Sequence, residues 1–186
     1  METIIPVVVF IQIFICEQDT GTIFDRLYQI LSKNFHVTAY DGRYFHAKSN
    51  PDFIIVKGQT LPRFTGSDFI VLVGENGHIG RDILENEPFP IIGDSANEHL
   101  RQALVKSQKP VIGCGLSRKD TFTLSSINED RATVSLLRDI NTLSGVLLEP
   151  SDFPFCLSGG LSDIELLIIA AFSILIDLPA ADAGKI

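Results

Sequence analysis

The residues best suited to chemistry lie in a glycine-rich stretch near the middle of the chain. Gly74, Gly77 and Gly80 recur at every third position directly after an apolar run, with Asn76 and His78 between them. Glycines let backbone N–H groups approach an anion, and a helix N-terminus beside them adds positive potential. The stretch therefore predicts a site for a phosphate or another small molecule, although its spacing matches neither the dinucleotide fingerprint nor the P-loop.

Acidic groups around this stretch limit what it can bind. Glu75, Asp82 and Glu85 lie in or beside it and would repel a phosphate. Asp94 follows the apolar pair Ile91-Ile92, and a carboxylate at a strand end can bind Mg²⁺ or act as a general base. Such residues are also ordinary turn residues, and a plain surface loop is the favoured alternative for the stretch. The predicted ligand-binding set is Gly74, Asn76, Gly77, His78, Gly80 and Asp94, with no catalytic and no metal-binding residue.

The cysteines and the adjacent pair Arg118 and Lys119 offer weaker chemistry. Cys114 lies between two glycines, but no histidine is near it in sequence to act as its base. The chain has three cysteines, Cys16, Cys114 and Cys156, and an odd number without metal-ligand spacing predicts buried thiols in a reducing cytoplasm. Arg118 and Lys119 could hold an anion, but a solvated turn is the favoured interpretation.

The composition is that of a globular protein with an acidic surface. Hydrophobic residues make up 45% and charged residues 20% of the 186 residues, which is enough for a core and argues against disorder. The net charge of −8 disfavours nucleic acid, because an acidic surface repels phosphate backbones. The apolar runs Ile4–Ile15 and Leu166–Ile176 are shorter than the ~20 residues that span a bilayer. These features predict a cytoplasmic protein that binds neither nucleic acid nor membrane.

Hydrophobic patterns place the candidate residues on a framework of strands and helices. A β-branched run within Ile4–Ile15 predicts a central strand, and a helix over residues 22–33 follows it. A second helix, ending near Ser107, is expected to begin at a Ser95-x-x-Glu98 capping box. Further strands are predicted at Phe35–Ala39, Asp52–Val56, Asp68–Val73 and Val111–Cys114.

The second half of the chain predicts an antiparallel extension. Thr121–Ile127 and Ala132–Leu137 alternate as the two arms of a hairpin, and strands are expected at Thr142–Glu149 and Asp152–Leu157. A last helix opens at a Ser162-x-x-Glu165 capping box. The predicted fold is a single α/β domain over residues 1–178, with a mostly parallel sheet, an antiparallel hairpin extension and helices on both faces. Residues 179–186 are expected to form a frayed tail.

From Phe69 onward, the order of elements resembles the second half of the central domain of the Mur ligases. The similar segments are FIVLVGENG, KPVIGCGLS, the turn LSGG, and the helix IELLIIAAFSILIDL with its Ala-Ala pair. The resemblance implies a bacterial protein related to the enzymes that join amino acids to UDP-linked muramic acid with ATP.

Two departures from the family pattern bear on activity. The family's P-loop, with Gly-Lys-Thr/Ser after the first strand, is replaced by a segment without lysine, Cys16–Gly21. The family's His-Asn pair before the last helix is replaced by Asp163 and Ile164. A phosphate cradle without its lysine loses most of the charge stabilisation that phosphoryl transfer requires. We therefore expect a degenerate relative that has lost ATP-driven ligation.

These observations favour a non-catalytic binding or interaction module that needs no cofactor and has an unidentified protein or small-molecule partner. The alternative is a small-molecule or nucleotide-binding enzyme that uses the Gly74–Gly80 loop. A third interpretation is a homo-oligomer with its interface on the apolar side of the hairpin.

Overall fold

The fold is described by a computed structural model over residues 10–18, 22–59, 69–79, 89–107, 111–157, 159–178 and 186. The strands of this part are β1 (Ile11–Cys16), β2 (Val37–Tyr40), β3 (Phe45–His46), β4 (Phe53–Lys57), β5 (Phe69–Val73), β6 (Ile91–Asp94), β7 (Val111–Cys114), β8 (Phe122–Ile127), β9 (Arg131–Leu136), β10 (Ile140–Asn141), β11 (Leu147–Leu148) and β12 (Ser151–Cys156). The helices are α1 (Ile23–Leu31), α3 (Glu98–Ser107) and α4 (Asp163–Leu175).

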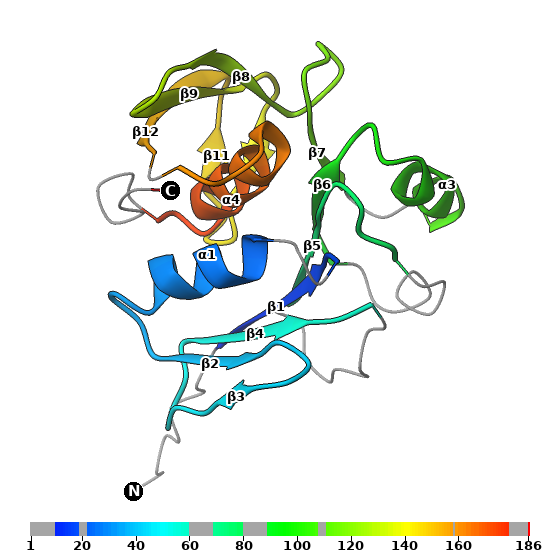
Figure 1. Cartoon of the computed structure of the whole chain (residues 1–186). Coiled ribbons are helices and arrows are strands. Elements are labelled where there is room, and N and C mark those ends of the chain that lie inside the picture. Colours follow the sequence, from blue (N-terminus) through cyan, green and yellow to red (C-terminus); the bar gives the residue numbers. More distant parts are fainter. Residues whose placement is uncertain are drawn as a thin grey trace, which may run out of the picture.

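Most of these strands form one mixed sheet in the order β12-β9-β8-β7-β6-β5-β1-β4-β2-β3 (Figure 1). Its middle part, from β2 to β7, is parallel. Central β1 has Ile13 opposite Ile55 of β4 on one side and Ile70 of β5 on the other. The antiparallel extension consists of β8, β9 and β12. The predicted parallel sheet with an antiparallel hairpin extension is therefore confirmed.

Helices cover both faces of the sheet, as predicted. Alternate residues of β5 show the two layers: Ile70 and Leu72 belong to the core cluster shared with α1 and α4, whereas Val71 and Val73 pack in a second cluster with Leu100 of α3. Figure 1 shows α1 and α4 side by side, with α3 across the sheet from them. All ten residues from 166 to 175 of α4 are buried, because this helix packs into the larger core.

The topology creates a switch point at β1 and β5. The chain leaves β1 through α1 for β2, on the β4 side, whereas it leaves β5 for β6 in the opposite direction. In open α/β sheets the carboxyl ends of strands that diverge in this way leave a crevice between their connections. The residues just after Cys16 and Val73 lie at this place.

Several details differ from the sequence predictions. The strand expected at Thr142–Glu149 is instead a separate hairpin of β10 and β11, because Gly145, at φ 85°, turns the chain. The residues after Phe89-Pro90 form β6, a strand that the neighbouring prolines concealed. Cys156 is exposed, because successive side chains of a strand point to opposite faces and that of its neighbour Phe155 is the buried one, whereas the other two thiols are buried as predicted.

Of the expected frayed tail, residues 179–186, the structure describes only Ile186. Ile186 is 1% exposed, and its N–H donates to the Cys156 carbonyl at 2.9 Å. The rest of the expected tail, residues 179–185, and the first part of the expected N-terminal strand, residues 4–9, lie outside the described residues.

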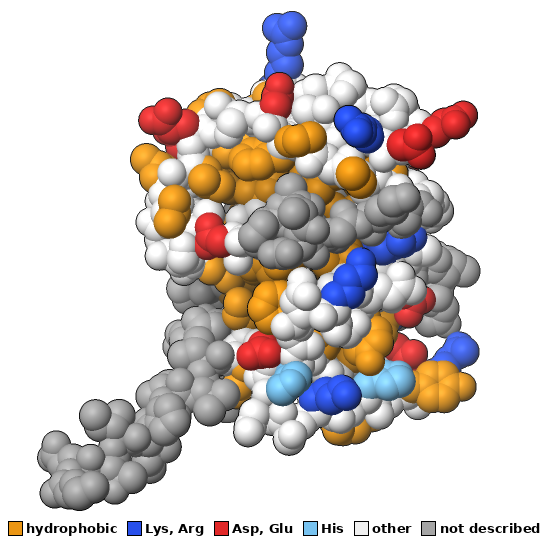
Figure 2. Space-filling model, turned by 90° about the vertical axis from the view of Figure 1, so that its left-hand side faces the viewer, with side chains coloured by type: hydrophobic (Ala, Val, Ile, Leu, Met, Phe, Trp, Pro, Cys, Tyr) orange, Lys and Arg blue, Asp and Glu red, His pale blue; other side chains and the backbone are white. Residues whose placement is uncertain are grey.

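Figure 2 shows one face of the molecule, on which hydrophobic side chains gather in the upper half, over the end of the sheet formed by β9 and β12. Basic and acidic side chains are scattered over the same face and do not form a patch of one sign. Within the described residues, no helix has the length and apolarity needed to cross a membrane.

Candidate functional site

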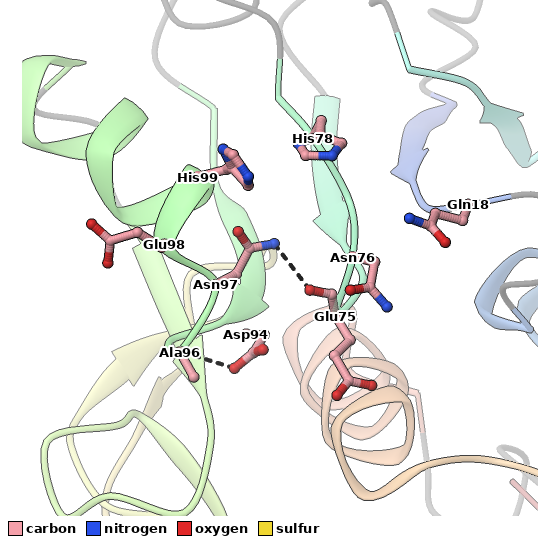
Figure 3. Close-up of a pocket in the computed structure, with 9 residues that line it drawn as sticks. All are labelled: Gln18, Glu75, Asn76, His78, Asp94, Ala96, Asn97, Glu98 and His99. Atoms are coloured by element: carbon pink, nitrogen blue, oxygen red, sulfur yellow. Dashed lines mark hydrogen bonds between the residues drawn. The ribbon is translucent and has the colours of Figure 1, made fainter.

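A cleft of about 330 Å³ opens at the carboxyl ends of β1, β5 and β6 (Figure 3). Its volume is at the low end of the range of ligand pockets, about 300–1,000 Å³. Nine residues line it: Gln18, Glu75, Asn76, His78, Asp94, Ala96, Asn97, Glu98 and His99. They come from the segments that follow three neighbouring parallel strands, which is where the topology predicts a ligand.

One wall of the cleft is the loop after β5, which packs closely on the end of β1. The Gly74 N–H donates to the Cys16 carbonyl at 2.9 Å, and the Gly77 N–H donates back to the Gly74 carbonyl at 2.9 Å. A Cβ atom at Gly77 would lie 2.1 Å from the Cys16 oxygen, so a side chain does not fit there. Gly74 and Gly77 are therefore buried against the end of β1, whereas Glu75 and Asn76 between them are exposed.

Asn97 ties this loop to the start of α3. Its side-chain Nδ2 donates to the carbonyl oxygens of Gly77 at 3.0 Å, Glu75 at 3.3 Å and Gly74 at 3.4 Å. Its Oδ1 accepts from the Leu100 N–H at 3.0 Å, as an N-cap side chain does. The buried Asn97 side chain thus fixes the distance between the two walls of the cleft.

The capping box predicted at Ser95-x-x-Glu98 is consequently wrong. The helix begins at Glu98, and Asn97 takes the capping position. The Ser95 N–H donates to the Cys114 carbonyl at 3.0 Å, which holds Ser95 in the connection from β6. An asparagine directly before the helix, with Leu100 three positions later, is the signal that could have revealed the true cap.

Asp94 forms part of the cleft floor at the end of β6. It is 5% exposed, and its Oδ1 accepts from the Ala96 N–H at 2.8 Å. Burial raises the pKa of Asp94, the hydrogen bond from Ala96 lowers it, and the nearby carboxylate of Asp120 raises it further. Asp120 is itself 3% exposed and accepts from the Ser117 N–H at 2.7 Å. Asp94 is therefore a carboxyl group that holds its proton more tightly than usual.

The rim of the cleft carries two histidines. The rings of His78, in the loop after β5, and His99, in the first turn of α3, lie with centroids 4.5 Å apart at 67° to each other. Both side chains are exposed, and Figure 3 shows them above Asn97 in the view. They give the entrance two flat faces that a ligand can contact.

A second arrangement lies next to the cleft, at the N-terminus of α1. Backbone N–H groups at such an end attract anions. Here the Glu17 carboxylate accepts from the N–H groups of Ile23 and Phe24, at 3.0 Å each. The Lys57 ammonium group lies 3.2 Å from Glu17 Oε1, and the side chains of Glu17 and Lys57 are 3% and 12% exposed. Burial raises the pKa of Glu17, against the lowering effects of the two amides and Lys57.

Glu165, far along the chain, places a second carboxylate at the N-terminus of α1. Its Oε1 accepts from the Thr22 N–H at 3.1 Å, while its Oε2 accepts from the Ser162 N–H at 2.9 Å. The predicted capping box of α4 is present, because the Ser162 hydroxyl accepts from the Glu165 N–H. Burial raises the pKa of Glu165, but the hydrogen bonds from Ser162 and Thr22 outweigh this effect and lower it overall. Thr22, in contrast, makes no side-chain cap.

A smaller hollow of about 100 Å³ lies over this helix end and adjoins the cleft through Gln18, Glu75 and Asn76. Its lining includes the carboxylates of Glu17, Glu75 and Glu165. Three carboxylates around one small volume disfavour an anionic ligand there.

The structure describes five of the six predicted ligand-binding residues, and not all of them line the cleft. Asn76, His78 and Asp94 line the cleft, Gly74 lines the smaller hollow, and Gly77 packs beneath the loop. Gly80 lies outside the described residues. Sequence reasoning did not select Gln18, Asn97 and His99 as site residues, although the cleft brings them together with the predicted ones. In the described part of the chain, no group of three or more His, Cys, Asp or Glu side chains is arranged to hold a metal ion.

Comparison of sequences finds no matching family model and no matching curated protein. Comparison of structures, in contrast, finds MurF from Acinetobacter baumannii, with a TM-score of 0.61 and 10% identity over 95% of this chain. The fold is Mur-ligase-like. A second A. baumannii structure, of the UDP-N-acetylmuramoylalanyl-D-glutamyl-2,6-diaminopimelate--D-alanyl-D-alanyl ligase, gives a TM-score of 0.62 at 9% identity over 95% of this chain.

MurF from Thermotoga maritima in complex with ADP gives a TM-score of 0.56 at 11% identity over 95% of this chain. The likeness extends over nearly the whole chain, whereas the sequence pattern indicated it only from Phe69 onward. This chain spans less than half of the length of the MurF chains that it matches, between 44% and 48%. Identities of 9–11% show the shared fold alone.

Proposed function

We propose that this chain is a Mur-ligase-like binding domain that does not catalyse ligation, and that its ligand is a small molecule bound in the cleft. We assign it to the bacterial cytoplasm, the setting that its Mur-ligase likeness implies. The observation that carries the proposal is the Glu17 carboxylate on the N-terminus of α1. It accepts from the same two N–H groups, of Ile23 and Phe24, that a phosphate bound at this helix end would need.

The place of Glu17 in the fold corresponds to the place of the ATP-binding loop in the Mur ligases. In the Mur ligases the P-loop follows the first strand of the central domain, and Glu17 directly follows β1. The T. maritima MurF structure contains ADP, so a protein of this fold binds a nucleotide. In this chain an internal carboxylate, with Lys57 beside it, takes the place of a bound phosphate. A nucleotide would have to displace Glu17 and approach Glu165 and Glu75 as well.

The cleft beside this closed site supports the binding part of the proposal. It is open, polar and formed by elements that Asn97 and Gly77 hold in fixed positions. A pre-formed cleft with convergent polar groups is the usual form of a small-molecule site.

Thermal unfolding with Mg²⁺-ATP and with ADP tests the proposal. A ligand at 100 times its dissociation constant adds about 2.7 kcal/mol of stability, or about 5–11 °C in Tm for a chain of this size. We expect no such shift for the wild-type chain. A shift of this size would overturn the proposal, as would ATP-dependent phosphate release by the wild-type chain.

The Glu17→Ala variant provides the matched positive control. It frees the N–H groups of Ile23 and Phe24 and removes Glu17 from Lys57, so we expect inorganic phosphate to stabilise this variant and not the wild type. Glu17→Gln keeps the size of the side chain and one acceptor oxygen for these N–H groups, so it should gain less phosphate-dependent stability than Glu17→Ala. Folded Glu17→Ala that gains no phosphate-dependent stability would contradict the closed anion site.

A further inference from the structure

The strand β3 ends the sheet with a free edge (Figure 1). Among the residues that the structure describes, β3 pairs with β2 on one side and with no strand on the other. Backbone N–H and C=O groups along such an edge are unpaired, and a strand from another chain can bind them. Natural proteins often block a free edge with a proline, and residues 44–48, YFHAK, contain none.

Hydrogen bonds to β2 and to the residue after it hold both ends of this short segment. The Tyr44 carbonyl accepts from the Asp41 N–H at 3.3 Å, and the Lys48 N–H donates to Thr38 Oγ1 at 3.1 Å. The Thr38 hydroxyl also lies 3.4 Å from the Lys48 carbonyl oxygen, to which it donates. The backbone groups of Tyr44 and Lys48 therefore point toward β2.

The backbone groups of Phe45 and Ala47 point the other way. Inward and outward positions alternate along an antiparallel strand, so His46 faces β2 and its two neighbours face outward. No residue in the described part of the chain forms a hydrogen bond with the N–H or C=O of Phe45 or Ala47. The edge therefore offers two donors and two acceptors, placed evenly on either side of His46.

The side chains along this edge include large aromatic groups that water contacts. Tyr44 is 68% and Phe45 67% exposed. The Phe45 ring lies 6.5 Å from that of Tyr40, whereas the His46 ring lies on the other face of the strand, 5.4 Å from that of Tyr28 in α1. Exposed aromatic side chains beside unpaired backbone groups are typical of an interaction surface.

We propose that two copies of this chain associate through β3, edge to edge and antiparallel, so that one sheet continues through both copies. A two-fold axis at His46 places Phe45 opposite Ala47 of the second copy and Ala47 opposite Phe45 of the second copy. Each of these pairs exchanges two backbone hydrogen bonds, so all the outward groups of both edges find partners. A second copy is the occupant because the edge is complementary to itself: groups spaced evenly about one residue match after half a turn.

The side chains also meet in compatible pairs. The large Phe45 ring faces the small Ala47 side chain of the second copy, which leaves room for it. On the opposite face Lys48 lies beside Tyr44 of the second copy, where its ammonium group can contact the aromatic ring. The net charge of −8 on each copy opposes association, so the dimer should be weak and should strengthen as salt screens this repulsion.

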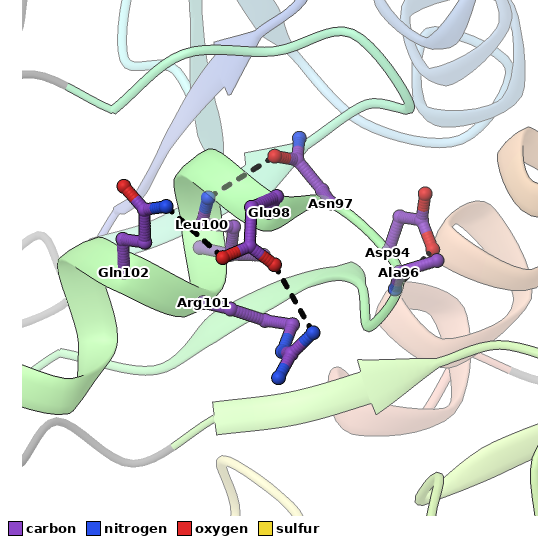
Figure 4. Close-up of polar contacts among 7 residues, drawn as sticks. All are labelled: Asp94, Ala96, Asn97, Glu98, Leu100, Arg101 and Gln102. Carbon is purple, nitrogen blue, oxygen red and sulfur yellow. Dashed lines mark hydrogen bonds and ion pairs between the residues drawn. The ribbon is translucent and has the colours of Figure 1, made fainter.

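The proposed dimer leaves the cleft accessible. Three strands, β1, β4 and β2, separate β3 from β5 in the sheet. Figure 4 shows the α3 wall of the cleft, where Asn97 caps the helix and Glu98 binds Arg101 and Gln102 of the same copy. This inference is therefore independent of the proposed function, and the failure of one does not bear on the other.

Sedimentation equilibrium of the whole chain tests the inference. We expect the average mass to rise from the monomer value of 20.5 kDa at about 5 µM toward twice that value at about 500 µM, as a small interface predicts. Hydrogen exchange followed by NMR should show the Phe45 and Ala47 amides exchanging rapidly in dilute solution. Both amides should exchange more slowly as the concentration rises.

Ala47→Pro is the decisive variant. Proline is accepted at an edge position whose N–H faces solvent, so the monomer should keep its fold and its circular dichroism spectrum. The substitution removes the N–H that donates to Phe45 of the second copy, and it should weaken association about tenfold or more. Phe45→Ser, which removes the exposed ring, should weaken association as well and serves if Ala47→Pro does not fold.

Leu147→Ser is the matched control, because it removes a side chain that is 57% exposed on the separate hairpin of β10 and β11. It should leave association unchanged within about twofold. A wild-type chain that stays monomeric at about 500 µM overturns the inference, since the edge then has no affinity for a second copy. A dimer that Ala47→Pro and Phe45→Ser leave intact, or that Leu147→Ser abolishes, overturns it too, because the interface then lies elsewhere.

Discussion

Replacing Gly77 by alanine should destabilise the protein, because this position has no room for a side chain. The new Cβ atom would lie 2.1 Å from the Cys16 carbonyl oxygen and 3.0 Å from both the Cys16 carbonyl carbon and Val73 Cγ1. A carbon–oxygen contact settles at roughly 3.3–3.6 Å, so the loop or the end of β1 has to move by about 1 Å. The neighbouring atoms are mainly backbone, which cannot rotate away as a flexible side chain would.

The cost follows from the contacts that such a movement strains. The Gly74 N–H bond to Cys16 and the Asn97 bond to the Gly77 carbonyl, at 2.9 and 3.0 Å, both span the region that must shift. Forcing an extra methyl group into a packed site costs about 1–3 kcal/mol. For a chain of this size we expect Tm to fall by about 2–12 °C.

Urea and thermal unfolding, followed by circular dichroism, would measure this loss against a matched control. At Gly113 the nearest atom to a new Cβ is 3.6 Å away, an ordinary contact. Gly113→Ala should therefore leave stability unchanged or raise it by up to ~1 kcal/mol, since alanine restricts the unfolded chain. If Gly77→Ala is as stable as Gly113→Ala, the close packing of the loop on β1, and the cleft wall that depends on it, would be refuted.

Three further predictions follow from burial and capping. Burial raises the pKa of Asp94 above its ordinary value of 3.8, so the folded state binds this proton more tightly than the unfolded chain does. The free energy of unfolding should therefore fall as pH rises from 3.8 through the raised pKa of the folded state. Urea unfolding at a series of pH values should show a shallower decline for Asp94→Asn, and an unchanged slope would contradict the assignment. A thiol reagent should modify Cys156 rapidly in the native protein, whereas Cys16 and Cys114 should react only after unfolding. Both of the latter are buried, and burial raises the pKa of Cys16 to about 12. Rapid labelling of all three cysteines in the native protein, measured by mass spectrometry, would refute this prediction. Ser162→Ala should cost about 0.5–2 kcal/mol, because it removes the hydroxyl that caps α4, and equal urea midpoints would argue against that cap.

The order of elements could be predicted from the sequence because the signals for it are local. The β-branched run of β1, the apolar run of β5 and the alternation of β8 and β9 each predict a strand without any knowledge of its neighbours. The capping box at Ser162-x-x-Glu165 is equally local, since both of its hydrogen bonds join residues three positions apart. These signals were sufficient for an α/β fold with a parallel sheet, and for the candidate loop after β5.

Only the tertiary structure decided which residues form the site, because its contacts join positions far apart in the chain. Glu165 reaches the N–H of Thr22 across 143 positions, and Asn97 reaches the Gly77 carbonyl across 20. Glu17 follows a predicted strand as an ordinary turn residue does, and the parallel pairing of β1 with β4 brings Lys57 beside it from 40 positions away. Hydrophobic periodicity in the sequence indicates which face of a helix or strand is buried, but it does not indicate which other helix or strand packs on that face. The position of Glu17 beside Lys57 at the N-terminus of α1, and the open cleft beside it, are therefore consequences of packing.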